Sequence, residues 1–151
     1  MRETPRPLWR GLDYGPALVV IDDSDTAPAD LPAGWEPLAQ RYQIAWCSVA
    51  HGQCLNAVED VLESLADRFT RTHLIARTVD AGTVARVVDE FPDVVRTVVM
   101  VGPGWAPKAN GVRTVRVAGT NLTDSAVVGS VVAAVEGVRP ASLAVTQSTM
   151  D

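Results

Sequence analysis

Thr78 is the residue whose place in the sequence most suggests covalent chemistry. It follows a short apolar run at residues 74–76 and Arg77, and it precedes a stretch from Ala81 onward with apolar residues at helical spacing. A hydroxyl at a tight turn between a strand and a helix can act as a nucleophile when a base stands beside it. Residues 73–82, HLIARTVDAG, are therefore the first place to look for an active site.

The chain offers few bases for such a hydroxyl, because it contains two histidines, His51 and His73. His73 begins the predicted strand that leads to Thr78, which places it at the opposite edge of the sheet. His51 follows a different predicted strand and lies on the Thr78 side. Cys54 with His51 is a further nucleophile–base pair by residue type, although only Gly52 and Gln53 separate the two.

Carboxylates follow the apolar strand at residues 17–21, where the sequence continues Asp-Asp-Ser. In a parallel sheet, sites form outside the carboxyl ends of the strands, so this cluster and Thr78 are expected at one edge. Burial and mutual repulsion there can raise a carboxylate pKa and permit acid–base work. For Arg77 the simplest expectation is pairing with one of these acids or with Asp80. The predicted ligand-binding residues are Asp22, Asp23, Ser24, Arg77 and Val79.

Two patterns raise the question of a metal. The oxygen-rich run at residues 22–25 can hold a divalent cation, but it lacks the spacing of a calcium loop and is better explained as a solvated acidic loop. Cys47, His51 and Cys54 provide three possible zinc ligands, without a fourth ligand or a typical spacing. We expect no metal and no cofactor.

Strand and helix patterns alternate along the whole chain. This alternation, with nearly continuous apolar strands, predicts a three-layer α/β/α fold with a mostly parallel sheet of about six strands. We expect one domain over residues 1–151, with an irregular lead-in at 1–15 packed through Trp9 and Tyr14, and a polar tail at 147–151. The predicted strands cover residues 17–21, 42–49, 73–77, 94–101, 113–118 and 141–146, and the predicted helices cover 35–41, 56–68, 81–91 and 124–136.

From residue 17 to about residue 138, the order of these elements resembles the α/β-hydrolase fold. The most specific part is residues 73–103, which look like that family's elbow strand, its following helix ending in Phe-Pro, and a strand closing in Gly-Pro. The family's Gly-x-Ser-x-Gly motif corresponds here to Ala76, Arg77, Thr78, Val79 and Asp80. The resemblance implies a hydrolase-like domain that lacks the family's first two strands and has its cap reduced to residues 102–111.

The resemblance also assigns roles. It places Thr78 at the nucleophile and Asp124 at the triad acid, so that the candidate catalytic residues are Thr78, Asp124 and His51. It puts Asp22 and Asp23 where the family stabilises an oxyanion, and carboxylates oppose that charge. The motif glycines are replaced, and no His follows His73 to act as the family's base. Asp124 also fits the start of the predicted helix at 124–136 without any catalytic role.

Composition narrows the function classes. The formal net charge is −5 and there is no basic patch, which argues against nucleic acid as a partner. No apolar run reaches membrane-spanning length and no signal-peptide pattern is present, so we expect a cytoplasmic protein. The use of Arg with a single Lys suggests a GC-rich bacterial coding sequence. The predicted helix at 124–136 is apolar around most of its circumference, which predicts cover by its own sheet or by a second copy in a homodimer.

Together these observations predict a catalytically degenerate α/β-hydrolase-like domain. It would work as a small-molecule-binding module or as a protein-interaction scaffold. The sequence leaves enzymatic activity open and favours its absence. The alternative is a small hydrolase or thioesterase, or an acid–base catalyst, that uses the crevice around Thr78, Asp22 and Asp23.

Overall fold

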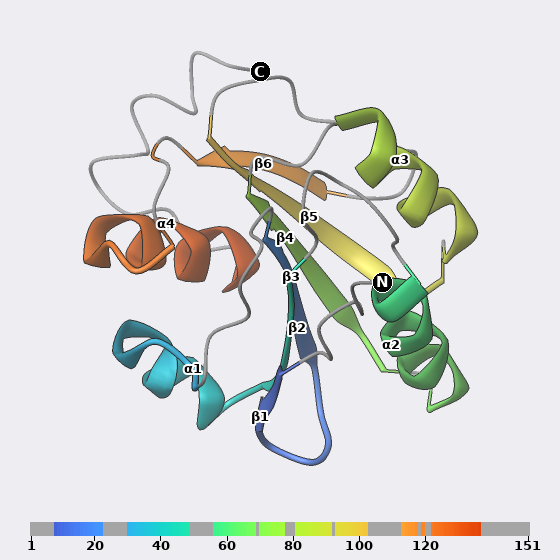
Figure 1. The fold of residues 1–151 in the computed structure, drawn as a ribbon, viewed down its shortest axis with the longest axis horizontal. Coiled ribbons are helices and arrows are strands. Elements are labelled where there is room, and N and C mark those ends of the chain that lie inside the picture. The colour runs from blue at the N-terminus through green and yellow to red at the C-terminus, as the bar shows by residue number, and fades with distance from the viewer. Residues whose placement is uncertain are drawn as a thin grey trace, which may run out of the picture.

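A computed structural model describes residues 8–22, 30–48, 56–68, 70–77, 81–91, 93–102, 113–117, 119 and 122–136. These residues form a sheet with helices on both faces, the three-layer α/β/α arrangement that the sequence predicts (Figure 1). The strands are β1 (Leu8–Gly11), β2 (Ala17–Asp22), β3 (Gln43–Ser48), β4 (Thr72–Arg77), β5 (Val95–Val101) and β6 (Arg113–Val117). The helices are η1 (Ala33–Trp35), α1 (Glu36–Ala39), α2 (Asn56–Asp67), α3 (Ala81–Glu90) and α4 (Ser125–Glu136).

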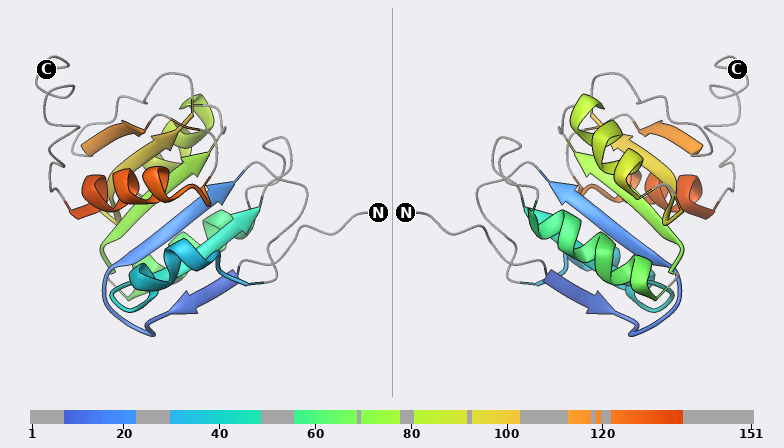
Figure 2. Two further views of the ribbon diagram at one scale, coloured as in Figure 1. Left: turned by 90° about the vertical axis from the view of Figure 1, so that its left-hand side faces the viewer. Right: turned by 90° about the vertical axis from the view of Figure 1, so that its right-hand side faces the viewer.

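The sheet has the strand order β1-β3-β2-β4-β5-β6. All neighbouring pairs are parallel except β1 with β3, which is antiparallel, and Figure 2 shows the β1 arrow running against the others. The central strand β2 is buried from Ala17 to Ile21, because strands lie on both of its sides and helices on both of its faces. Its unbroken apolar run is what such a position requires.

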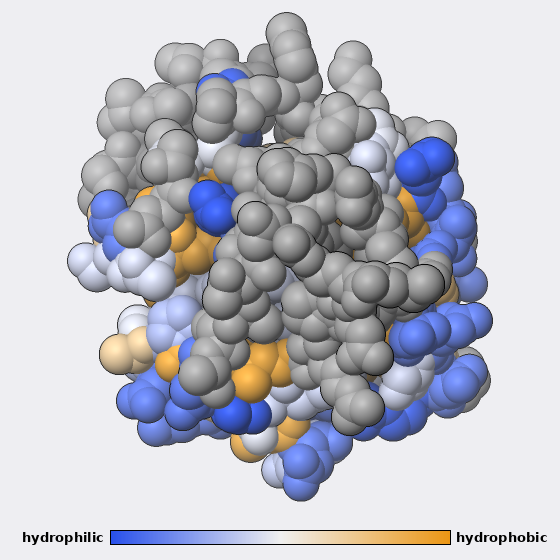
Figure 3. All heavy atoms as spheres, in the orientation of Figure 1, coloured by the Kyte–Doolittle hydropathy of each residue, from blue (hydrophilic) through white to orange (hydrophobic). Residues whose placement is uncertain are grey.

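Each face of the sheet carries its own core. On one face, α2 and α3 cover residues that include Val19, Ala45 and Leu74. On the other, η1, α1 and α4 cover the alternate residues, which include Val20, Trp46 and Ile75. The outward surfaces of α2 and α3 are hydrophilic (Figure 3), as expected for helices with one apolar stripe. Successive side chains of a strand point to opposite faces, so this division follows directly from the strand pattern.

The lead-in is the part of the fold that the sequence reasoning described wrongly. Residues Leu8–Gly11 form an edge strand paired with β3, so a strand does precede β2. The side chains of Trp9 and Tyr14 are 38% and 73% exposed and do not anchor this segment in the core. An edge strand that buries little needs no apolar alternation, and β1 therefore lacks the pattern by which the other strands were found. The predicted strand at 141–146 and the tail at 147–151 lie outside the described residues.

Helix α4 is covered by its own chain. Val127, Val128 and Val131 pack into the core of the η1 and α1 face. The indole Nε1 of Trp35 donates a hydrogen bond of 2.8 Å to the carbonyl of Leu122, which fixes η1 to the segment before α4. The apolar circumference of α4 thus needs no second chain to explain it, and the homodimer stays a prediction without this support. Among the described helices, none combines the length and apolarity needed to cross a membrane.

Gly11, at the end of β1, has a backbone that only glycine adopts easily. Its φ is +92°, and a Cβ placed there would lie 2.3 Å from the carbonyl oxygen of Tyr42. Gly15 has a similar φ of +86°, but a Cβ there meets nothing within 4 Å. An alanine at Gly15 would therefore meet backbone strain alone, whereas an alanine at Gly11 would meet backbone strain and a steric overlap.

We expect Gly11→Ala to lower the free energy of unfolding by about 3 kcal/mol and Gly15→Ala by about 1 kcal/mol. The first change adds an overlap with backbone, which cannot rotate away, to the cost of positive φ that both changes share. Urea unfolding followed by circular dichroism measures both values. Equal losses in the two variants would contradict the packing described for β1.

Candidate functional site at the carboxyl ends of the strands

Ser48, Asp22 and Arg77 end three adjacent strands and lie side by side across the sheet. The register pairs Asp22 with Ser48 of β3 and with Arg77 of β4. Since neighbours in register share a face of the sheet, all three side chains lie on the face covered by η1, α1 and α4. The row continues into Val101 and Val117, the last residues of β5 and β6. A polar cluster therefore occupies one half of this edge and an apolar surface the other half.

An ion pair joins the ends of β2 and β4. The Nε of Arg77 donates to Oδ1 of Asp22 over 2.5 Å, and the two side chains are 23% and 14% exposed. Charge-assisted hydrogen bonds of this kind are short and about twice as strong as neutral ones. Arg77 also has interactions beyond this pair. The carboxylate of Asp22 is thus paired with the guanidinium of Arg77.

Two buried donors lie on β3, on the same face of the sheet as this ion pair, and one of them, Ser48, is in register with Asp22. Neither Ser48 Oγ nor Trp46 Nε1 has a hydrogen-bond partner within the described part of the chain. Their residues are 2% and 3% exposed. Residues 46 and 48 alternate along one strand and so point to the same face as Asp22. The rings of Trp46 and Trp35 pack edge-to-face, with centroids 5.2 Å apart.

Of the residues predicted to form the site, the structure brings Asp22 and Arg77 together. This confirms the expectation that Arg77 pairs with an acid of the β2 end. His73 is the second residue of β4 and pairs with Leu18 and Thr97, far from the strand's carboxyl end, as its sequence position predicted. Five further predicted site residues lie outside the described residues: His51, Thr78, Val79, Asp23 and Ser24.

Asp124 starts a helix. Its Oδ1 accepts a hydrogen bond of 2.9 Å from the backbone N–H of Ala126, and its carbonyl accepts one from Val128 N–H at 2.9 Å. Both bonds satisfy donors of the first turns of α4, and the Asp124 side chain is exposed. The structure therefore gives Asp124 the helix-starting role that its position in the sequence allows.

The metal hypotheses find no support in the described residues. Asp22 is bound to Arg77, and Cys47 lies in the core of the α2 and α3 face. Within the described ranges, no group of three or more His, Cys, Asp or Glu side chains is placed to hold an ion. Burial raises the pKa of the Cys47 thiol to about 12, which disfavours the thiolate that metal binding and nucleophilic attack require.

Ser48 and Trp46 are site residues that the sequence reasoning missed. It placed the end of the second parallel strand at residue 49, whereas β3 ends at Ser48. A signal was present: Ser48 is a polar residue that ends an apolar strand, at a position equivalent to Asp22 on the strand before it in the chain. What the sequence could not supply was the register, which places Ser48 directly beside Asp22.

Comparisons with known proteins find one similar solved structure and no matching family. No protein-family model matches the chain. No curated protein matches it. Among solved structures, it is similar to a variant of N-formylmaleamic acid deformylase from Pseudomonas putida S16, with 20% identity and a TM-score of 0.42. The match covers 64% of this chain and 42% of the deformylase, so the chain spans less than half of that enzyme's length.

The role of Asp124 can be tested by stability. We expect Asp124→Ala to lower the free energy of unfolding by about 1 kcal/mol, because the first turn of α4 loses its side-chain acceptor. Asp124→Ser keeps an acceptor and should cost only a few tenths of a kcal/mol. Chemical denaturation of the three proteins measures this, and an equal loss in both variants would refute the capping role.

Cys47 should be chemically inert in the folded protein. With a thiol pKa of about 12, roughly one Cys47 in ten thousand is a thiolate at pH 8. In a Cys54→Ser background, we expect iodoacetamide to leave Cys47 unmodified under native conditions and to alkylate it after unfolding in urea. Mass spectrometry provides the measurement, and rapid alkylation of the folded protein would overturn this placement.

Proposed function

We propose that the protein is a small-molecule-binding domain of α/β-hydrolase-like architecture that does not hydrolyse its ligand. The observation that carries this proposal is that two buried donors of β3, Trp46 Nε1 and Ser48 Oγ, have no hydrogen-bond partner among the described residues, and that Ser48 lies in register with Asp22 of the ion pair. They lie at the carboxyl edge of a mostly parallel sheet, where such folds bind ligands.

The ion pair argues against hydrolysis. An acyl-transfer site needs hydrogen-bond donors aimed at the oxygen that becomes negative. At the end of β2 the side chain is instead the carboxylate of Asp22, and its Arg77 partner is already engaged. A developing oxyanion beside this carboxylate would be repelled. The sequence adds the loss of the motif glycines and of a His after His73.

The unpartnered donors argue for binding. A buried polar group without a hydrogen bond costs about 1–3 kcal/mol, because it has lost water and gained nothing in return. A ligand oxygen that accepts from Ser48 Oγ or Trp46 Nε1 recovers that free energy. Since both donors are almost completely shielded from solvent, such a hydrogen bond would form in a low-dielectric environment, where it is strong.

The charges indicate which ligands fit. Asp22 and Arg77 neutralise each other directly, so among the described residues of this cluster the one negative and the one positive charge are paired. The adjoining positions Val101 and Val117 are buried and apolar. The ligand class that matches is a small, neutral and largely apolar molecule with a carbonyl or similar acceptor oxygen.

Ser48→Ala provides the sharpest test. Because the hydroxyl has no hydrogen-bond partner among the described residues, we expect the variant to be as stable as the wild type or more stable by up to about 1 kcal/mol. A panel of neutral esters, lactones and amides is then screened by thermal shift. We expect at least one compound to raise the Tm of the wild type and of the control Ser130→Ala, with a much smaller effect on Ser48→Ala.

Two outcomes would count against the proposal. A loss of about 1 kcal/mol or more in unliganded Ser48→Ala would show that the hydroxyl has a partner in the protein. Sustained turnover of p-nitrophenyl or thioester substrates that disappears in Thr78→Ala would establish the hydrolase alternative. We expect no turnover above the level of that variant.

A further inference from the structure

A hollow lies at the other end of the sheet from the Asp22–Arg77 pair, between β1 and the C-terminal end of α2. Its volume is about 460 Å³, within the range of sites that hold small molecules. The residues that line it include Trp9, Leu12, Asp13, Gln43, Ser64 and Arg68. Gln43 begins β3 and Gly11 ends the antiparallel β1, so the hollow lies at the amino edge of the parallel strands, opposite the Asp22–Arg77 site.

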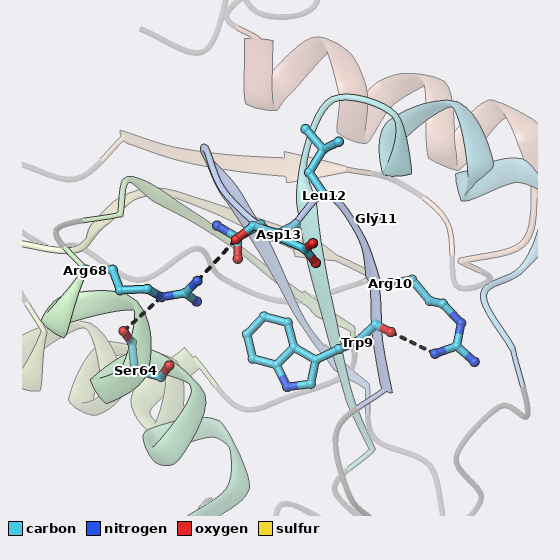
Figure 4. A pocket seen from close by; sticks show the side chains of 8 residues that line it. Trp9, Arg10, Gly11, Leu12, Asp13, Ser64 and Arg68 are labelled. Carbon is cyan, nitrogen blue, oxygen red and sulfur yellow. Dashed lines mark hydrogen bonds between the residues drawn. The ribbon is translucent and has the colours of Figure 1, made fainter.

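Arg68 supplies a cation to this hollow. It follows the last turn of α2 and reaches toward the backbone of β1 and the turn after it (Figure 4). Its Nε donates to the Ser64 carbonyl at 3.5 Å and its Nη1 to the Asp13 carbonyl at 3.4 Å. Both bonds are longer than the 2.7–3.2 Å typical of N–H···O, so they hold the guanidinium in place without using its full donor capacity.

The charge of Arg68 is not matched by an acid. Among the described residues, it forms no ion pair, and Asp13 meets it through a backbone carbonyl. The contrast is Arg10 on β1, whose Nε lies 2.8 Å from Oδ1 of Asp30. Arg10, which Asp30 pairs, and Asp13 also line the hollow. The hydrogen bonds of the Arg68 guanidinium itself go to neutral backbone carbonyls.

Trp9 supplies an aromatic wall. Its register partner is Ala45, which belongs to the core beneath α2, so the indole projects on the α2 side of the sheet. Figure 4 shows the ring on the side of the hollow that faces Ser64 and Arg68. The side chain remains 38% exposed, which leaves apolar surface for a flat group to cover. An aromatic face and a guanidinium fork together match a planar acid.

We propose that this hollow binds small aromatic monocarboxylates. The carboxylate accepts two hydrogen bonds from the guanidinium of Arg68, and the ring packs against Trp9 and Leu12. The site is separate from the one under the proposed function and does not depend on it, because its residues come from β1, the start of β3 and the end of α2.

Benzoate is the probe, and benzamide is its neutral counterpart of the same shape. Binding is followed by chemical shifts of the protein amides in titrations up to on the order of 10 mM, since a ligand of this size in an open hollow binds weakly. We expect benzoate to shift the amides of Leu12, Ser64 and Arg68. Benzamide should bind at least about tenfold more weakly, because it cannot form the charged pair.

Variants separate a specific site from general attraction. Arg68→Gln should weaken benzoate binding at least about tenfold, whereas Arg96→Gln, which removes an exposed arginine on β5, should leave it unchanged. Trp9→Ala should weaken benzoate and benzamide alike. Circular dichroism confirms that each variant is folded, and the amide shifts report the site even if stability falls.

Three results would overturn the proposal: no shifts in the hollow with benzoate, equal affinity for benzamide and benzoate, or equal weakening by Arg68→Gln and Arg96→Gln. Competition also distinguishes the two sites. A neutral ligand of the Ser48 cluster should not displace benzoate, so the failure of one site leaves the other intact.

Discussion

The complete burial of β2 is the constraint on which the rest of the structure depends. Parallel strands flank it on both sides and helices cover both faces, so no side chain from Ala17 to Ile21 can be polar without an internal partner. The first charged residue appears where the strand leaves this environment, at Asp22. There the in-register neighbour Arg77 lies next to it, and the two charges are held together at the edge of the core.

The same register explains why this edge is polar on one side only. Ser48, Asp22 and Arg77 end β3, β2 and β4, while Val101 and Val117 end β5 and β6. Helix α4 packs over the apolar half and gives those valines their cover. The polar half includes Ser48, whose hydroxyl has no hydrogen-bond partner among the described residues.

The fold class and most of the strands and helices were predictable from the sequence, because they depend on short-range patterns of apolar residues. Nearly continuous apolar runs locate the five parallel strands, apolar residues at a period of 3.6 locate the long helices, and the alternation of the two predicts the fold class. The pairing of Arg77 with an acid at the β2 end was predictable as well, since both residues end predicted strands. Asp124 fits a helix start from its position alone.

The parts that the sequence did not disclose depend on long-range placement. β1 buries little, so its residues carry no pattern that distinguishes a strand from a loop, and only its pairing with β3 defines it. Trp46 and Ser48 look like ordinary residues of a buried strand. That their donors find no acceptor in the described part of the chain depends on what surrounds them in space, and local sequence spacing does not encode this.

The members of the two cores lie in different parts of the chain. This determines which core can form first while the chain is being synthesised. The core under α2 and α3 draws all its buried residues from Ala17 to Met100. The opposite core also requires Leu122 to Val135, and Trp35 anchors to the carbonyl of Leu122. On a ribosome the first core can close while the second still lacks α4. The face that carries Trp46, Ser48 and the ion pair is thus the last to be covered in a nascent chain.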